Sequence, residues 1–209
     1  LGQWNGIGAV VVAQDRAAQN DGSELGPGAL RMARRGFALA VELRLPLITI
    51  VDTAGAELSV AAEQGGLAGE IARCLSELTT LPVPTVSVLL GMGCGGGALA
   101  LLPADRVVAA AHAWVSPLPL EGASVIRYRT PDRAADMARS QRVAAWQLAE
   151  SGIVDVGVPE YPDAAQEPEE FCRRVSDTVS TALVDLISSD AAKRLSARTA
   201  RYRGGLDVD

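Results

Sequence analysis

The sequence predicts an α/β protein built on a mostly parallel sheet. Short apolar, β-branched runs alternate along the first half of the chain with segments of helical periodicity. The runs lack the polar alternation of a half-exposed sheet, which indicates strands covered by helices on both faces. With 209 residues, of which 48% are hydrophobic, the chain is long enough to bury a large core. We therefore expect residues 1–209 to form a single domain.

The first half of the chain is predicted to alternate strands with helices. In chain order we expect a strand at 7–15, a loop at 20–28, a helix at 28–44, a strand at 47–51, a helix at 61–80 and a strand at 84–91. Strand–helix–strand connections of this kind are right-handed in nearly all proteins. This order favours parallel strands with helices packed on the sheet.

The second half is predicted to be mainly helical. We expect strands at 105–110 and 113–116, a loop at 117–122, helices at 122–128 and 131–150, and helices that begin at Pro168 and after a capping Asp190, the last running to about 203. Gly152 is placed as the residue that ends a helix before IVDVGV. The helix after Pro168 carries one apolar stripe, formed by Phe171, Val175, Val179, Leu183 and Leu186. We expect this stripe to associate with a partner.

Two loops are predicted to lie at the same edge of the sheet. The loop at 52–56 follows the strand at 47–51, and the loop at 91–97 follows the strand at 84–91. Ligands of open parallel sheets bind at the carboxyl ends of the strands, where both loops lie. Each loop leads toward a predicted helix, whose first N–H groups favour a negative charge. The sequence therefore predicts an anion-binding edge.

The second of these loops, GMGCGGG at 91–97, has glycine at five of its seven positions. A phosphate cradle would use such a turn, although neither GxxxxGK[ST] nor GxGxxG is present. Nucleophilic catalysis by Cys94 with His112 as the base is a second chemistry, although Met92 stands where a nucleophile elbow has glycine. A third is an oxyanion hole made of backbone N–H groups, which needs no catalytic side chain. A tight turn that binds nothing is the structural alternative.

Three segments taken together resemble one known family. They are LPLITIVDTAGAELSVAAEQGGLAGEIARCLSEL, then GMGCGGGALALLPADRV, then EGAS. In this order they resemble the α-type half of the acetyl-CoA carboxylase carboxyltransferase, which is the C-terminal half of fused β–α forms and belongs to the crotonase-like superfamily. The resemblance runs from about Gly28 to the motif RYRGG near the end of the chain.

The resemblance implies a crotonase/ClpP-like spiral of strand–strand–helix turns, with C-terminal helices for association. It implies a biotin-dependent carboxyltransferase that moves a carboxyl group from carboxybiotin on a carrier protein to acetyl-CoA, giving malonyl-CoA for fatty acid biosynthesis. The backbone amides of Gly96, Gly97 and Ala98 would form the oxyanion hole for biotin. The substrate-binding residues that it implies are Gly55, Ala56, Gly95, Glu121 and Gly122.

The resemblance also implies partners, because this half of the carboxyltransferase acts together with other proteins in the family. They are a β-type carboxyltransferase half, a biotin carboxyl carrier protein, biotin carboxylase and a second copy of the chain. No metal is expected, because the zinc ribbon of the family belongs to the β-type half and the cysteines here form no CxxC pair. The net charge of −6 argues against nucleic acid, and no apolar run approaches the roughly 20 residues of a membrane span. We expect a cytoplasmic subunit, or a part of a longer fused protein.

The sequence departs from the family at DTAGAELS, where DTPGAYPG is usual and Glu57 introduces a charge. Two alternatives therefore stay open. One is a free-standing crotonase-type hydratase or isomerase, with Glu63, Glu70 or Glu121 as the carboxylate. The other is an inactive scaffold half. If the oxyanion hole is correct, valine at 96 or 97 should place its Cβ in the ligand's space and abolish transfer, whereas Cys94→Ala should leave it within a few-fold.

Overall fold

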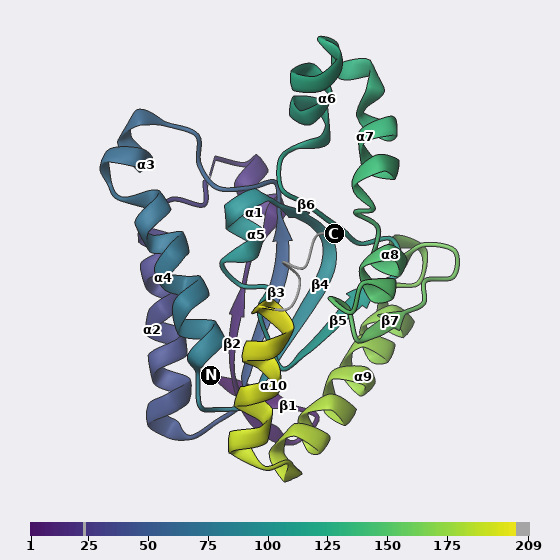
Figure 1. Cartoon of the computed structure of the whole chain (residues 1–209). Coiled ribbons are helices and arrows are strands. Elements are labelled where there is room, and N and C mark those ends of the chain that lie inside the picture. Colours follow the sequence, from purple (N-terminus) through teal and green to yellow (C-terminus); the bar gives the residue numbers. More distant parts are fainter. Residues whose placement is uncertain (23, 204–209) are drawn as a thin grey trace.

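The computed structural model describes residues 1–22 and 24–203. They form a seven-stranded sheet with helices packed around it (Figure 1). The strands are β1 (Gly2–Trp4), β2 (Ile7–Ala13), β3 (Leu47–Thr53), β4 (Thr85–Cys94), β5 (Arg106–Ala110), β6 (Trp114–Ser116) and β7 (Val156–Val158). The order across the sheet is β1-β2-β3-β4-β5-β7, and β6 pairs with β4. Only β1 runs antiparallel to its neighbour among these strands, so the predicted mostly parallel sheet is confirmed.

The helices are α1 (Arg16–Asn20), α2 (Pro27–Leu43), α3 (Val60–Gln64), α4 (Leu67–Thr80), α5 (Gly95–Leu99), α6 (Leu120–Tyr128), α7 (Ala134–Gln141), α8 (Ala145–Glu150), α9 (Pro168–Ser188) and α10 (Ala191–Arg203). Short 3₁₀ turns occupy Pro131–Arg133 and Ala164–Gln166. No helix of the described residues is long and apolar enough to cross a bilayer. Residue 23 of the predicted loop, and the two glycines of RYRGG, lie outside the described residues.

Two predicted helices are broken in the structure. The helix expected at 61–80 is divided into α3 and α4, because Gly66 adopts a left-handed conformation with φ of 84° that an α-helix cannot contain. The helix expected at 131–150 is interrupted after α7 by Arg142, with φ of 54°. There the backbone turns away to pair with β6: the N–H of Val115 donates to the carbonyl of Val143 at 2.9 Å. Helical periodicity does not reveal such a change of backbone partner.

Two other elements have boundaries that differ from the predicted ones. Helix α6 begins at Leu120, inside the predicted loop, and the carbonyl of Pro119 accepts its first bond from Ala123. Strand β4 continues past the predicted end at 91 to Cys94. Its first part pairs with β5 as far as Leu89, and its last three residues pair with β6. One strand therefore joins two successive strand pairs, and its second part carries the glycine-rich segment.

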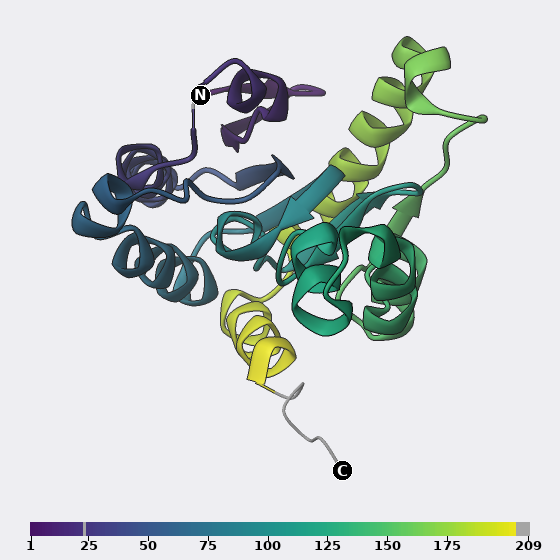
Figure 2. The same cartoon turned by 90° about the horizontal axis from the view of Figure 1, so that it is seen from above.

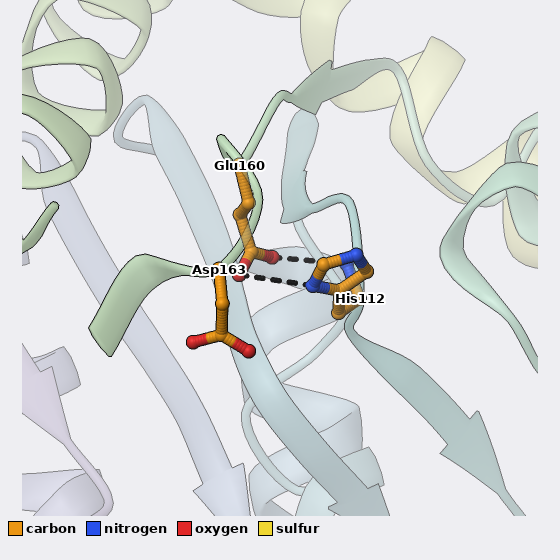
Figure 3. Close-up of side chains that lie close together, drawn as sticks. All are labelled: His112, Glu160 and Asp163. Carbon is orange, nitrogen blue, oxygen red and sulfur yellow. Dashed lines mark hydrogen bonds and ion pairs between the residues drawn. The ribbon is translucent and has the colours of Figure 1, made fainter. Parts of the chain in front are cut away.

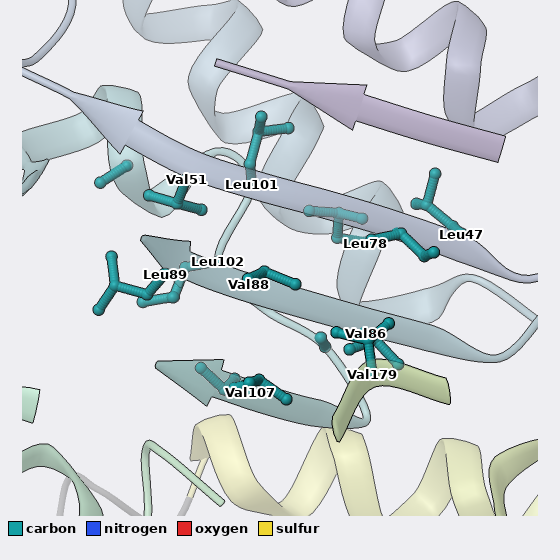
Figure 4. Packing of buried hydrophobic residues seen from close by; sticks show 14 of the residues in the cluster. Leu47, Val51, Leu78, Val86, Val88, Leu89, Leu101, Leu102, Val107 and Val179 are labelled. Atoms are coloured by element: carbon teal, nitrogen blue, oxygen red, sulfur yellow. The ribbon is translucent and has the colours of Figure 1, made fainter. Parts of the chain in front are cut away.

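The core lies along β3 and β4, which helices cover on both faces. Helices α2, α4 and α10 lie on one side of the sheet and α9 lies on the other (Figure 2). Aliphatic side chains from adjacent strands fill the space between them (Figure 4). Leu47, Ile48 and Val51 of β3 are fully buried. The sheet is thus apolar on both faces, as the unbroken apolar runs predicted.

The apolar stripe of α9 is buried within this chain. Its side chains pack on β4, β5 and β7. The buried residues of the helix are Phe171, Val175, Val179, Ala182, Leu183 and Leu186. The expectation that this stripe serves association is therefore wrong: it closes one face of the chain's own sheet, because the parallel strands need cover on both sides.

Helix α10 is attached by a buried charge. The carboxylate of Asp190 caps its first turn, accepting from the N–H of Lys193 at 2.8 Å, as predicted. Farther along, the guanidinium of Arg198 donates to both oxygens of Asp105, at 2.8 and 2.7 Å. It also donates to the carbonyls of Leu78 and Leu81. This fully buried cation therefore ties α10 to the end of α4 and the start of β5.

Candidate functional site

The two loops that the sequence placed at one edge of the sheet are in contact. They follow β3 and β4, which are adjacent and parallel. A Cβ built on Gly97 would lie 3.0 Å from the backbone N of Ala56 and 3.0 Å from the carbonyl carbon of Gly55. A Cβ on Gly55 would in turn lie 3.7 Å from the sulfur of Cys94. The predicted shared edge is confirmed, and the two loops are in direct contact with each other.

The glycine turn passes from β4 directly into the five-residue helix α5. Gly95 makes the change of direction with a positive φ of 57°. Gly96 and Gly97 lie in the first turn of α5, where N–H groups have no intrahelical acceptor, and no side chain of the described residues caps this turn. Gly96 is half-buried and Gly97 is buried. The turn therefore carries two N–H donors without a side-chain or intrahelical acceptor, which suit an anionic oxygen better than a cation.

The missing side chains of these glycines face the chain itself. A Cβ on Gly96 would come within 2.8 Å of Cδ1 of Ile71 on α4. A Cβ on Gly97 would meet Leu25 at 2.8 Å as well as the loop at 55–56. The expectation that valine there would project into ligand space is therefore wrong, because the Cβ direction points into neighbouring helices and loops. At Gly97 the close neighbours include backbone atoms of the loop at 55–56, so packing favours glycine there; at Gly96 the close neighbour is the end of the flexible Ile71 side chain, which can move.

A side chain that the sequence did not single out holds the loop at 52–56. Gln19 of α1 accepts from the hydroxyl of Thr53 at 2.8 Å and from the N–H of Ala54 at 3.2 Å. Its amide nitrogen donates to the carbonyl of Gly55 at 3.2 Å. Gly55 needs this support because its φ of 122° is one that other residues rarely adopt. Gln19 thus fixes the loop through three contacts with its backbone and hydroxyl.

Asp52 joins the ends of β3 and β4. Its Oδ1 accepts from the backbone N–H of Met92 at 3.1 Å and from Nε of Arg16 at 3.2 Å. A Cβ on Gly91 would lie 3.0 Å from the same oxygen, so glycine there permits the close approach. Gln14 completes the set: its amide donates to the carbonyl of Gly97 at 2.7 Å. Local sequence patterns carried no signal for these contacts, since each partner is remote in sequence.

The thiol chemistry considered from the sequence does not fit the structure. Cys94 is 1% exposed. Burial raises the pKa of the Cys94 thiol; the nearby Ser116 opposes this and the negative charge of Glu121 adds to it. Such a thiol stays protonated at neutral pH, unlike an activated nucleophile. His112 is exposed on the turn before β6, where Nδ1 lies 3.2 Å from Glu160 and not on Cys94 (Figure 3).

His112 belongs to a different side-chain group. With Glu160 and Asp163 it forms a set of three possible metal-ligating atoms that lie within 4.8 Å of one another (Figure 3). Glu160 also accepts from the backbone N–H groups of His112 and Ala164, at 2.9 and 3.0 Å. These bonds tie the turn between β5 and β6 to the segment after β7. The group accounts for the position of His112 without catalysis.

Of the carboxylates considered, only Glu121 lies near the glycine turn. Its charge acts on the Cys94 thiol, and it is exposed with Gly122 in the first turn of α6. Glu63 is exposed on α3. Glu70 is buried among arginines: burial acts to raise its pKa, but the hydrogen bond from Arg34 and the charges of Arg73, Arg34 and Arg31 outweigh it and lower the pKa. A carboxylate used in this way is not a hydratase base.

The unusual Glu57 is turned away from the glycine turn. It accepts from the hydroxyl of Ser59, which caps α3. A Cβ on Gly26 would lie 2.7 Å from its Oε2, so its carboxylate packs against the residue before α2. The N–H of Glu57 donates to the carbonyl of Leu25 at 3.1 Å. Its charge therefore serves the junction between this loop and α2.

Fold and site together define the class of protein. Residues 11–205 match the family described as acetyl co-enzyme A carboxylase carboxyltransferase-like, and the chain belongs to that family. It is 55% identical over 203 residues to a probable biotin-dependent acyl-coenzyme A carboxylase beta3 subunit of Mycobacterium tuberculosis, covering 97% of this chain and 41% of the relative. It is 37% identical to the acetyl-coenzyme A carboxylase carboxyl transferase subunit alpha of Rhodospirillum centenum, covering 92% of this chain and 63% of the relative.

Solved structures confirm the crotonase-like carboxyltransferase fold. A Pseudomonas malonate decarboxylase hetero-tetramer in complex with coenzyme A superposes with a TM-score of 0.73 at 18% identity, over 98% of this chain and 85% of the other. The transcarboxylase 12S structure superposes with a TM-score of 0.71 at 22% identity, over 86% of this chain and 34% of the other. At these identities the likeness concerns the fold alone. The chain spans about two fifths of the length of the first of the relatives above.

Proposed function

We propose that this chain is the α-type part of a biotin-dependent acyl-CoA carboxylase and that it moves a carboxyl group from carboxybiotin to acetyl-CoA, giving malonyl-CoA. The observation that carries the proposal is the glycine turn at the carboxyl end of β4, where the N–H groups of Gly96 and Gly97 open α5 without a side-chain cap. Membership of the carboxyltransferase family supports the reaction class. The proposal takes residues 1–209 as one carboxyltransferase domain.

The residues present fit biotin chemistry better than acid–base catalysis. Carboxybiotin would supply the carboxyl group and, once that group has left, the base for the acyl methyl. The N–H groups of Gly96 and Gly97, with Ala98 beside them, would donate to the ureido oxygen as negative charge develops on it. The buried, protonated Cys94 removes no proton. The loop at 55–56, Gly95 and the start of α6 at Glu121 and Gly122 would line the substrate site.

The proposal requires other protein around this chain. A β-type half would supply the oxyanion hole for the acyl thioester, a biotin carboxyl carrier protein would deliver the carboxyl group, and biotin carboxylase would load it. A second copy of the chain would complete the assembly. The relatives support this view, since the chain covers only 41% of one and 34% of another that is named as beta/alpha subunits.

The test removes one N–H group while keeping the added Cβ the same. Gly96→Pro and Gly96→Ala both place a Cβ near Ile71, but only proline lacks the N–H. Proline is tolerated in the first turn of a helix, where the N–H has no intrahelical partner. In a complex reconstituted with the β-type half and the carboxylated carrier, we expect Gly96→Pro to lower kcat for malonyl-CoA formation by roughly 10²- to 10³-fold relative to Gly96→Ala.

Two results would contradict the proposal. One is equal kcat for the two variants when thermal unfolding shows both to be folded, because the N–H would then have no role. The other is a loss of transfer in Cys94→Ala, which we expect to stay within a few-fold of the unmodified chain. Comparing acetyl-CoA with longer acyl-CoA substrates in the same assay decides the acyl group.

A further inference from the structure

We propose that Gln14 is a positioning residue that fixes the peptide between Gly97 and Ala98 in the glycine turn. Its consequence for catalysis rests on the proposed function. Gln14 is the first residue after β2, and its Nε2 donates to the carbonyl of Gly97 at 2.7 Å. The two residues are 83 positions apart in the chain. The contact therefore joins the edge of the sheet to the turn that follows β4.

The carbonyl of Gly97 needs an external donor because α5 ends too soon to supply one. The N–H of Ala100 donates to Gly96 at 3.0 Å, and the N–H groups of Leu101 and Leu102 both donate to Ala98 at 3.1 Å. None of these three N–H groups donates to the carbonyl of Gly97. Within the described residues, the amide of Gln14 is its hydrogen-bond donor. A buried carbonyl without a donor would be costly, so the contact is strongly favoured.

Holding this carbonyl also orients the next N–H group. A peptide unit is planar, and its C=O and N–H point in opposite directions, so fixing the carbonyl of Gly97 fixes the N–H of Ala98. The preceding residues are glycines, which resist rotation less than other residues do. An external anchor therefore matters more here than in an ordinary helix. Gln14 thereby holds the end of the turn that carries the N–H groups of Gly96 and Gly97.

Gln14 is itself held in one orientation. Its backbone N–H donates to the carbonyl of Ile50 at 2.9 Å, which continues the pairing of β2 with β3. The next residue, Asp15, caps α1 through the N–H of Ala18 at 3.1 Å. A flipped amide would place Oε1 against the carbonyl of Gly97, so the observed orientation is the one with a bond. Its Oε1 is buried without a partner among the described residues, which is the cost of keeping the donor in place.

The experiment compares three variants in the reconstituted complex. Gln14→Leu removes the donor at similar size, and we expect kcat to fall about 10- to 100-fold while KM for the acyl-CoA changes less than about two-fold. In Gln14→Glu the ionised carboxylate cannot donate, but the protonated acid can. Burial raises the pKa of such an acid, so its activity relative to the unmodified chain should recover as the pH falls. The Leu variant should show no such recovery.

Gln141→Leu is the matched control. This glutamine, at the end of α7, also has a buried Oε1 that finds no partner in the described part of the chain, but it makes no hydrogen bond to the glycine turn. We expect its kcat and KM to match those of the unmodified chain. A Gln14→Leu complex within two-fold of normal kcat would overturn the inference. So would a loss of stability and affinity with no pH-dependent recovery in Gln14→Glu.

A second measurement keeps the inference separate from the proposed function. If the unmodified complex transfers no carboxyl group, the proposed function fails, but the orientation of the peptide can still be measured. Amide hydrogen exchange at Ala98 should accelerate about tenfold or more in Gln14→Leu relative to Gln141→Leu. Equal exchange in the two variants would contradict a positioning role whatever the reaction is.

Discussion

Helices α9 and α10 follow one another in the chain but are attached to the sheet by opposite kinds of contact. Helix α9 presents a continuous apolar stripe, in which Val179 and Leu183 are fully buried. Helix α10 is held by Arg198, whose side chain is fully buried against Asp105. Apolar burial is non-directional and spread over many positions. A buried ion pair is directional and is concentrated at a single position. The unfolding free energy should therefore respond differently to single substitutions in the two helices.

The largest effect is expected at the buried pair. Arg198→Met leaves the carboxylate of Asp105 and three backbone carbonyls without the guanidinium donor. Removing one partner of a buried ion pair costs about 3–5 kcal/mol of unfolding free energy. Urea unfolding measures this cost. The control is Arg173→Met on the outer face of α9, whose ion pairs with Glu170 and Asp177 are exposed and which should lose less than about 1 kcal/mol.

An intermediate effect is expected from the apolar helix. Leu183→Ala removes buried methyl groups from the face of α9 and should cost about 3 kcal/mol in the same unfolding measurement. Val184→Ala is the control, since Val184 is 57% exposed on the next position. Similar losses in the two variants would mean that α9 does not hold the sheet by this stripe, and that its association role should be considered again.

The smallest effect is expected in thiol reactivity. It compares a cysteine on the exposed face of α9 with one on the buried face of α4. Cys172 of α9 is exposed, whereas Cys74 is buried where α4 packs on α2. Burial raises the pKa of Cys74 to about 12. At pH 8 only about one in ten thousand Cys74 thiols would be ionised, and a raised pKa keeps the thiolate scarce until the pH approaches it.

We therefore expect iodoacetamide to label Cys172 in the native protein at pH 8 and to leave Cys74 and Cys94 unlabelled, as read by mass spectrometry. All three should react in guanidinium chloride. Labelling of Cys74 at a rate similar to that of Cys172 in the native state would show that α4 separates readily from α2 and α10. Adding the β-type half to the same assay tests whether a partner covers the outer face of α9.

The sequence alone determined the alternation of strands and helices, because apolar periodicity follows from which faces of an element are buried. It also determined that the loops at 52–56 and 91–97 meet, since the carboxyl ends of adjacent parallel strands share one edge. The motifs in DTAGA, GGGALA and EGAS placed the chain in its family, because their order and spacing are specific.

Only the tertiary structure decided which groups surround the glycine turn. It showed that the missing side chains of Gly96 and Gly97 make room for Ile71 and Leu25, and that no side chain of the described residues caps the first turn of α5. It also placed the amide of Gln14 on a carbonyl 83 residues away. Local patterns record the environment of each element, but they do not record which distant group it meets. Those meetings depend on how the layers pack, and the packing exists only in the folded chain.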